Sequence, residues 1–129
     1  MWCALPYYNE VHTRIMKPEI KERWVKALRS GEYEQTTGIL HGDEGYCCLG
    51  VLCDLYAKEH DVFWNYNSNT MRYDMFGEDL NLPLKVVEWA SVNRNPAVVQ
   101  EGMGTTTLSF MNDGGFDFNQ IAQIIEEQL

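Results

Sequence analysis

One stretch of the sequence restricts the fold more than any other. Residues 45–56 form the longest nearly uncharged, apolar run in an otherwise acidic chain, GYCCLGVLCDLY. As a helix, this run is apolar on almost every side, which is typical of an element buried inside a domain. Cys48, Val51, Leu52 and Leu55 recur at i, i+3, i+4 and i+7 and form one packing stripe. The sequence therefore predicts a buried central helix against which the other elements pack.

The same helix carries a second stripe with different chemistry. Cys47 and Asp54 are seven residues apart, so they lie within about 20° of each other around the helix axis. Gly50 stands between them, one turn along, where the missing side chain leaves room beside the helix. We expect the first stripe to be core and this second stripe to face whatever the protein binds.

The length and charge of the sequence indicate one globular domain and argue against binding to nucleic acid or insertion into a membrane. A chain of 129 residues has the size of a single domain, here residues 18–129, preceded by an N-terminal arm of residues 1–17. Nineteen acidic against ten basic residues give a formal charge of −9, which argues against nucleic-acid binding. No run is long enough to span a membrane, and the N-terminus lacks the basic and apolar regions of a signal peptide.

The cysteines indicate a reducing compartment. The sequence has four, at Cys3, Cys47, Cys48 and Cys53. Three of them crowd the predicted central helix, where neighbouring side chains point apart, so reduced thiols are expected rather than a disulfide framework. A cytoplasmic location follows.

Helix and strand signals are mixed along the chain, as is typical of an α+β fold. Pro18 fits the first position of a helix that ends at Gly31, and Asp117 with Gln120 forms a capping-box variant before the last helix. Residues 33–41, rich in β-branched side chains, predict a strand. Also expected are a hairpin of residues 62–66 and 71–73, short helices near 83–90 and 107–112, and a strand at 97–100. The predicted fold is a buried central helix with two or three further helices and a small antiparallel sheet.

An enzyme is one open alternative. Cys47 or Cys48 lies at the start of the central helix, where the helix dipole lowers a thiol pKa, and His41 or His60 is a conceivable base. Buried cysteine is equally common as simple packing. No zinc site is expected, because Cys47, Cys48 and Cys53 point around the helix and no second ligand pair closes a tetrahedral site. No cofactor is expected either.

Aromatic and amide side chains are the main candidates for ligand binding. Most of the aromatic residues must be core, but those around the hairpin can line a pocket that stacks on a planar ring such as a base. Asn112 and Asp113 join two predicted helices, where they either contact a ligand or form a helix-ending turn. The predicted ligand-binding residues are Tyr33, Gln35, Cys47, Asp54, Trp64, Tyr66, Arg72, Asn112 and Asp113.

Three motifs of the sequence resemble a known family. They are W-V-x-A-L-R-S-G-x-Y-x-Q from residue 24, G-Y-C-C-L-G-V-L-C-D from residue 45, and M-N-D-x-G-x-x-F-x-x-I-A from residue 111. Together they resemble small uncharacterised proteins common in tailed-bacteriophage genomes, over residues 20–129. The resemblance implies a viral protein in the host cytoplasm.

The expected function follows from that setting. Small accessory phage proteins often act against host machinery or host defence. We therefore expect a non-enzymatic accessory protein that binds a host protein or sequesters a small signalling molecule, such as a nucleotide, in counter-defence. A cysteine-dependent enzyme and a virion assembly protein are the alternatives. A homodimer is also open, because a small domain with an aromatic arm has surface to cover.

Overall fold

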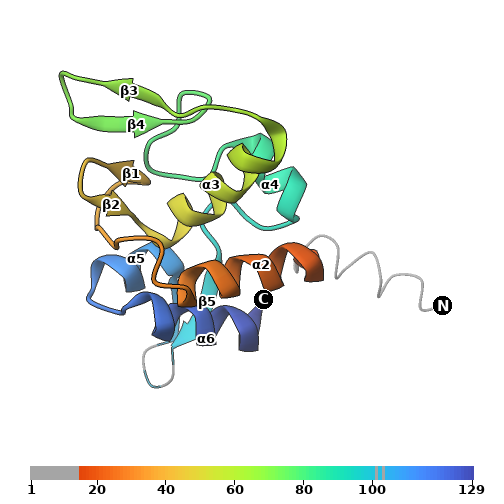
Figure 1. Cartoon of the computed structure of the whole chain (residues 1–129). Coiled ribbons are helices and arrows are strands. Elements are labelled where there is room, and N and C mark those ends of the chain that lie inside the picture. Colours follow the sequence, from red (N-terminus) through yellow and green to blue (C-terminus); the bar gives the residue numbers. More distant parts are fainter. Residues whose placement is uncertain (1–14, 101, 103) are drawn as a thin grey trace.

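The chain folds into an α+β structure with one helix at its centre (Figure 1). The computed structural model describes residues 15–100, 102 and 104–129. The helices of this part are α2 (Pro18–Arg29), α3 (Cys48–His60), α4 (Leu84–Ala90), α5 (Leu108–Asp113) and α6 (Phe118–Gln128). The predicted α+β class is confirmed, with four described helices beside the central one where two or three were expected.

Two antiparallel sheets complete the described fold. The strands of the larger sheet are β1 (His41–Gly42), β2 (Gly45–Tyr46), β3 (Asn65–Asn67) and β4 (Arg72–Asp74), in the order β2-β1-β4-β3. It consists of two hairpins that pair through β1 and β4. The smaller sheet pairs β5 (Ala97–Gln100) with β6 (Gly104–Thr107). In Figure 1 the larger sheet stands on one side of α3, and α2 and α6 lie below it.

α3 is the buried helix that the sequence predicts. Cys48, Val51 and Leu52 of the expected packing stripe are fully buried, and Leu55 is partly buried against the same core. The Trp24 Nε1–H of α2 donates to the Cys48 carbonyl oxygen at 2.9 Å and fixes α2 against the first turn of α3. α3 ends at Asp61, which adopts a left-handed conformation with φ of 58°.

Sequence signals at the helix ends are confirmed for the two helices that pack along each other below α3. Pro18 is the first residue of α2. Asp117 accepts a hydrogen bond from the Gln120 N–H at 2.8 Å, and Gln120 Oε1 accepts one from the Asp117 N–H at 2.9 Å. This capping box starts α6, whose apolar face packs on α2 (Figure 1).

Gly50 lies where the segment before β1 crosses α3. A Cβ atom at this position would lie 1.8 Å from the Leu40 carbonyl oxygen, so only glycine permits the approach. The same carbonyl accepts a hydrogen bond from the Cys47 N–H at 3.0 Å. Backbone therefore fills the space beside Gly50, and the room for a ligand that we expected there is absent.

Residues 33–41 contain far less strand than the sequence predicts. Gln35 forms an isolated bridge to Tyr46, and strand β1 starts only at His41. The backbone of residues 34–36 bonds to one strand residue, Tyr46 of β2, and side chains of α5 bind the Thr36 carbonyl oxygen and the Gly38 N–H. β-branched composition indicated a strand here, but tertiary contacts override that local preference.

The two other hairpins show what turn signals could and could not predict. β3 and β4 form the expected hairpin, displaced by one to three residues at the strand ends. Its positive φ of 59° falls on Met71 rather than on one of the asparagines. β6 was not predicted, although its three threonines favour a strand, because the neighbouring glycines indicated a loop.

The expected N-terminal arm, residues 1–17, lies mainly outside the described residues, as does Cys3. The last residues of this arm belong to the folded part. Met16 is buried, and the Lys17 N–H donates to the Ala90 carbonyl oxygen at 3.0 Å. Packing of the domain therefore starts before the first residue of α2.

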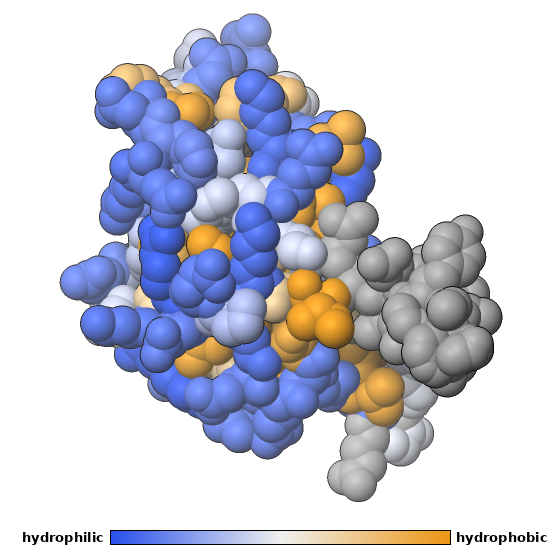
Figure 2. All heavy atoms as spheres, turned by 90° about the vertical axis from the view of Figure 1, so that its right-hand side faces the viewer, coloured by the Kyte–Doolittle hydropathy of each residue, from blue (hydrophilic) through white to orange (hydrophobic). Residues whose placement is uncertain are grey.

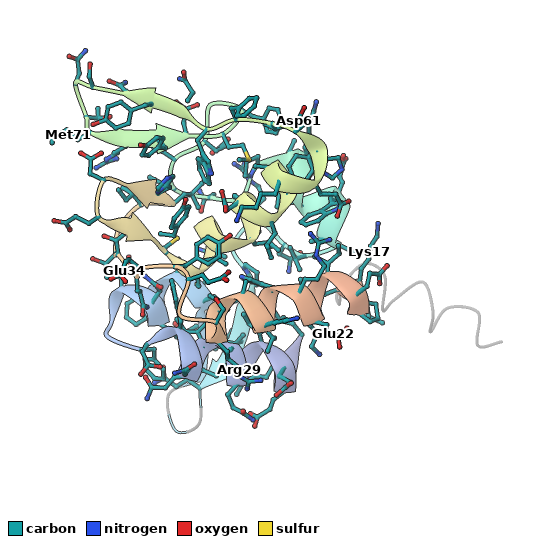
Figure 3. All side chains as sticks on the ribbon, viewed as in Figure 1. Lys17, Glu22, Arg29, Glu34, Asp61 and Met71 are labelled. Atoms are coloured by element: carbon teal, nitrogen blue, oxygen red, sulfur yellow. The ribbon has the colours of Figure 1, made fainter. Side chains whose placement is uncertain are left out.

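Charge is divided unevenly over the surface. Residues 15–29, which include α2, hold five basic and two acidic residues, whereas residues 30–80 hold ten acidic and two basic ones. Figure 3 labels Lys17, which precedes α2, together with Glu22 and Arg29 of α2. The face in Figure 2 is mainly hydrophilic, with apolar residues in separate small patches. Among the described helices, none is both long and apolar enough to cross a membrane.

Candidate functional site

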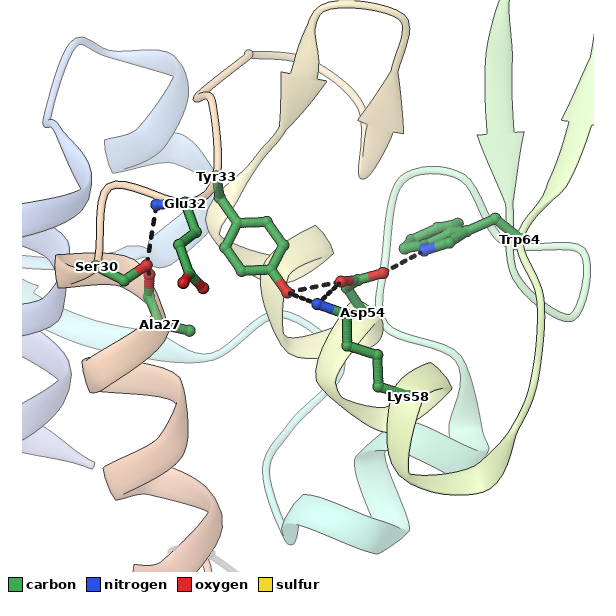
Figure 4. A network of polar contacts seen from close by, with 7 residues as sticks. All are labelled: Ala27, Ser30, Glu32, Tyr33, Asp54, Lys58 and Trp64. Atoms are coloured by element: carbon green, nitrogen blue, oxygen red, sulfur yellow. Dashed lines mark hydrogen bonds and ion pairs between the residues drawn. The ribbon is translucent and has the colours of Figure 1, made fainter.

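The turn after α2 directs Tyr33 toward α3. Ser30 Oγ donates to the Ala27 carbonyl oxygen at 2.7 Å and accepts a hydrogen bond from the Glu32 N–H at 3.0 Å (Figure 4). Gly31 takes the positive φ of 80° that this reversal requires. The chain thereby leaves α2 with the Tyr33 hydroxyl pointing at Asp54.

Asp54 is the centre of a polar network on the side of α3 that faces the larger sheet. Its Oδ2 accepts a hydrogen bond from the Tyr33 hydroxyl at 2.6 Å, and its Oδ1 accepts one from Trp64 Nε1–H at 3.1 Å. Lys58, one turn further along α3, places Nζ 3.3 Å from Asp54 Oδ2 and 3.1 Å from the Tyr33 hydroxyl (Figure 4). Asp54 is 8% exposed, so two neutral donors and one cation hold a nearly buried carboxylate.

Protonation in this network is fixed at neutral pH. Burial, with the hydrogen bond to Asp54, raises the pKa of Tyr33 to about 12. The hydrogen bond with Tyr33 raises the pKa of Lys58 to about 12, and the Asp54 charge adds to this. Tyr33 therefore stays a neutral donor and Lys58 stays a cation, which excludes both as bases at neutral pH.

Four rings line one face of the larger sheet, and we call Tyr46, His41, Tyr73 and Tyr66 the aromatic ladder. They are direct partners across β2, β1, β4 and β3, so they share one face. His41 stacks between Tyr46 at 3.8 Å and Tyr73 at 4.0 Å between ring centroids, with interplanar angles of 8° and 9°. Tyr66 continues the row 4.8 Å from Tyr73.

The aromatic ladder joins the Asp54 network through two edge-on rings. Trp64 lies 5.0 Å from His41, and Tyr33 lies 5.0 Å from Tyr46, both as centroid distances. Burial lowers the pKa of His41, and its Nδ1 donates to the Gly45 carbonyl oxygen at 2.9 Å. The ring in the middle of the ladder is therefore neutral at neutral pH, and the negative charge of this face comes from carboxylates around it.

A shallow pocket opens beside Asp54 at the end of α3. Its volume is about 360 Å³, near the lower end for small-molecule pockets. The lining residues are Asp54, Ala57, Lys58, Asp61, Val62, Phe63 and Trp64. Phe63 is 83% exposed, an unusual position for a phenylalanine. The pocket thus combines a buried carboxylate, a second acid and two aromatic side chains with a single lysine.

Comparison with known families matches residues 16–129 to the family described as a domain of unknown function (DUF8296). The chain belongs to this family. No curated protein and no solved structure matches it. The matched region of this DUF8296 domain starts at Met16, the first described residue that is buried in the core.

A second polar cluster of the DUF8296 domain is built on Asn112, which is buried at the end of α5. Its Oδ1 accepts hydrogen bonds from Gln35 Nε2 at 2.9 Å and from the Cys48 N–H at 3.1 Å. Its Nδ2 donates to the Thr36 carbonyl oxygen at 2.8 Å. Both ends of the Asn112 amide therefore bind protein groups. One of these groups is the Cys48 N–H, which lies in the first turn of α3 and has no partner within the helix.

Asp113 and Gln35 extend this cluster, which we call the Asn112 clasp. Asp113 Oδ1 accepts a hydrogen bond from the Gly38 N–H at 2.9 Å, and Gln35 Nε2 also donates to the Phe116 carbonyl oxygen at 2.8 Å. The sequence predicted Gln35, Asn112 and Asp113 as ligand-binding residues. The structure brings them together, with Asn112 and Asp113 at the end of α5 binding the backbone of residues 35–38, and a ligand contact stays a prediction.

The cysteines of the DUF8296 domain are buried in the core instead of exposed at a reactive site. Cys47, Cys48 and Cys53 are buried free thiols. Burial raises the pKa of Cys47 to about 11 and raises those of Cys48 and Cys53 well above the usual value. A thiol with a raised pKa is protonated at neutral pH and is a poor nucleophile. No group of three or more His, Cys, Asp or Glu side chains among the described residues is placed to hold a metal ion.

The remaining candidates lie apart from these clusters or at their rim. Tyr66 ends the aromatic ladder and donates to Asp43 Oδ2 at 3.2 Å, and Arg72 lies 3.4 Å from Asp79 Oδ2. Cys47 is the extended N-cap residue that precedes α3, and it is buried instead of facing the pocket. The expected stripe of Cys47, Gly50 and Asp54 therefore presents only Asp54 at the candidate site.

Sequence reasoning missed several side chains that complete this site. Lys58 was detectable, because it follows Asp54 by four residues and such pairs meet on one helix face. His41 was considered only as a base, although it stands in the ladder between Tyr46 and Tyr73. That stacking depends on the register between two hairpins distant in sequence, and no local pattern reports it.

Proposed function

We propose that this DUF8296 domain is a non-enzymatic binding protein whose contact surface for a protein partner is the Asp54 pocket with the aromatic ladder. The observation that carries the proposal is the highly exposed Phe63 at the rim of a pocket with a buried carboxylate. Aromatic side chains beside a pocket are typical centres of binding energy in protein interfaces.

Charge indicates the kind of partner. The pocket and ladder lie in the part of the chain that holds ten acidic and two basic residues. An acidic face attracts a basic protein surface and repels nucleic acid. The proposed partner is therefore a protein with a basic contact surface, and nucleic acid and membrane are not part of the proposal.

The state of the thiols supports a role without catalysis. Cys47 and Cys48 are buried and their pKa values are raised, so neither is activated as a nucleophile. Tyr33 and Lys58 are held in their protonated forms. The groups near the pocket are thus suited to recognition by charge and stacking, and the proposal includes no cofactor.

The biological setting is part of the same proposal. The motifs at residues 24–35, 45–54 and 111–122 resemble proteins common in tailed-bacteriophage genomes. We propose that the domain acts in the host cytoplasm as a phage accessory protein, binding a host protein in counter-defence. A homodimer is compatible with this role and is decided by the native mass spectrum described below.

A matched pair of phenylalanine variants tests the contact surface. Phe63→Ala removes the exposed ring at the pocket, and Phe110→Ala removes one that is 68% exposed on α5. Immobilised wild-type protein, F63A and F110A are incubated with host extract, and retained proteins are compared by quantitative mass spectrometry. We expect a partner retained by wild type and F110A and lost by F63A. Equal retention by both variants, or no specific partner at all, would refute the proposal.

A second candidate function is sequestration of a small planar molecule. Phe63 and Trp64, which line the pocket of about 360 Å³, favour it, because aromatic side chains stack on planar rings. The acidic surroundings favour a neutral or cationic molecule over a phosphate-rich nucleotide. A native mass spectrum of freshly purified protein reports both the number of subunits and any retained small molecule, and a spectrum without added mass would count against this candidate.

A further inference from the structure

The ammonium group of Lys58 occupies a place that is built for a cation. Its Nζ lies 3.3 Å from Asp54 Oδ2, 3.1 Å from the Tyr33 hydroxyl and 5.3 Å from the centroid of the Tyr33 ring. A carboxylate, a hydroxyl and a ring face are the three groups that stabilise a cation at a protein surface. The position is thus defined by Asp54 and Tyr33, and the lysine is one cation that can fill it.

Lys58 itself is only loosely held. Its side chain is 67% exposed, whereas the Asp54 side chain is 11% exposed. An ion pair with so exposed a lysine contributes little to stability, because water and salt screen the charge and the long side chain loses freedom. Asp54 is different, because a nearly buried carboxylate without a nearby cation is unfavourable. The site therefore needs a cation more than it needs this particular lysine.

The walls of the pocket fit a planar cation. Trp64 and Phe63 line it together with the apolar Val62 and Ala57, and Asp61 adds a second negative charge. A guanidinium group stacks on aromatic rings and forms paired hydrogen bonds with a carboxylate, which an ammonium group cannot do. Residues 30–80 hold ten acidic and two basic residues, and Asp54, Asp61 and Lys58 are the charged residues among them that line the pocket. The pocket therefore lies in a part of the chain with a net negative charge, which suits a basic partner surface.

We propose that the pocket receives an arginine side chain of the partner protein, whose guanidinium replaces the Lys58 ammonium beside Asp54. This inference rests on the proposed binding function and adds the chemistry of the contact. Lys58 acts as an internal substitute that holds the carboxylate while the partner is absent. When arginine replaces Lys58, an exposed and weak ion pair is exchanged for one that is desolvated inside the interface. Arginine residues at the centres of interfaces are typically desolvated in this way.

The indole of Trp64 provides a direct reporter. Its Nε1–H donates to Asp54 Oδ1 at 3.1 Å, so its proton resonance responds when a new cation binds the carboxylate. The sequence has four tryptophans, and Trp64→Phe identifies the resonance by its disappearance. Trp24 and Trp89 donate to the Cys48 carbonyl oxygen and to Glu59, and they serve as internal controls.

The experiment is a titration followed by two-dimensional ¹H–¹⁵N NMR with Nα-acetyl-arginine methylamide. The control probe is Nα-acetyl-citrulline methylamide, which has nearly the same shape without the charge. We expect saturable shifts of the Trp64 indole with the arginine probe in the millimolar range, and unchanged Trp24 and Trp89 resonances. Equal shifts with both probes, or none with arginine, would overturn the proposal. Both titrations use the wild-type protein, and Trp64→Phe serves only to assign the resonance, so the binding result does not depend on the folding of a mutant.

Two lysine variants then test the exchange. Lys58→Met removes the ammonium but keeps the side-chain length, and we expect arginine to bind about two- to fivefold more tightly, the equivalent of one exposed ion pair. Lys85→Met is the matched control, because Lys85 lies over the Phe76 ring instead, and we expect no change. Unchanged or weaker binding to K58M would overturn the role given to Lys58.

Other occupants give different results. Adenosine monophosphate shifting Trp64 more than the arginine probe would overturn the cation assignment while leaving a binding function in place. A Trp64 shift that grows with protein concentration alone would show that a second copy fills the pocket, and would overturn the assignment to a partner protein. Loss of the partner in the F63A capture experiment with no response to arginine would refute this inference and retain the proposed function.

Discussion

Replacement of Gly50 by alanine tests the packing at the centre of the fold. The added Cβ would lie 1.8 Å from the Leu40 carbonyl oxygen, whereas ordinary contact starts at 3.4 Å, so α3 and the crossing segment must separate. Separation strains the hydrogen bonds from the Cys47 N–H to Leu40 and from the Leu40 N–H to the Asp79 carbonyl oxygen, 3.0 and 2.8 Å long. Both lie at the junction of the core and the larger sheet.

The expected loss for Gly50→Ala follows from these terms. Overpacking of a filled core costs about 1–3 kcal/mol, and each weakened hydrogen bond adds about 0.5–1.5 kcal/mol. Alanine offsets about 1 kcal/mol through its higher helix propensity. The net loss is about 1–5 kcal/mol, which is large beside the stability of a typical domain, about 5–15 kcal/mol.

Chemical denaturation followed by far-ultraviolet circular dichroism measures this loss. Gly114→Ala is the control, because Gly114 has an ordinary φ of −87° and its new Cβ would lie 3.1 Å from the Phe110 carbonyl oxygen, a tight contact that a shift of a few tenths of an ångström relieves. We expect G114A to change the free energy of unfolding by less than about 1 kcal/mol. If G50A were as stable as G114A, the close approach of Leu40 to α3 would be refuted.

Three further predictions concern the Asn112 clasp, the loss of stability at alkaline pH and the reactivity of the thiols. Asn112→Leu should cost about 2–4 kcal/mol in the same unfolding assay, because it leaves buried backbone groups without partners; Asn119→Leu on the exposed side of α6 is the control, and equal losses would contradict the clasp. Because burial raises the pKa of Tyr33 from 10.0 to about 12, the folded state holds its proton more tightly, so its contribution to stability is complete below pH 10.0 and is lost toward pH 12. Tyr33→Phe should flatten this decline, and an unchanged slope would argue against the Asp54 network. In a Cys3→Ser variant, iodoacetamide should not label the three buried thiols below pH 8 unless the protein is unfolded, and stoichiometric labelling seen by mass spectrometry would contradict their packing.

Elements with local chemical causes could be predicted from the sequence. Asp117 and Gln120 define the start of α6 by bonding each other across three residues, and the apolar run around Val51 identifies the buried helix. The hairpin of β3 and β4 follows from the polar turn between two aromatic runs. Each of these signals depends on interactions within a short window of the chain, so one sequence is enough to find it.

The candidate site was only partly predictable, because long-range register assembles it. Asp54 and Trp64 were expected to bind a ligand and do lie together, ten residues apart. His41 reaches Tyr73 only because β1 pairs with β4, a contact between separate hairpins. Residues 33–41 were predicted as a strand, since composition does not show that Asn112 and Asp113 bind their backbone. In this segment, hydrogen bonds from distant side chains override the local strand propensity.

The way in which α3 begins has a consequence for the integrity of the whole chain. Cys47 gives this helix no side-chain cap, and the amide of Asn112 supplies one from far along the sequence. A polypeptide that stops ahead of residue 112 would bury an unsatisfied N–H in its interior. Cleavage or premature termination near the C-terminus should therefore abolish folding altogether instead of trimming the last two helices. We therefore expect the domain to unfold as one cooperative unit that includes its last two helices.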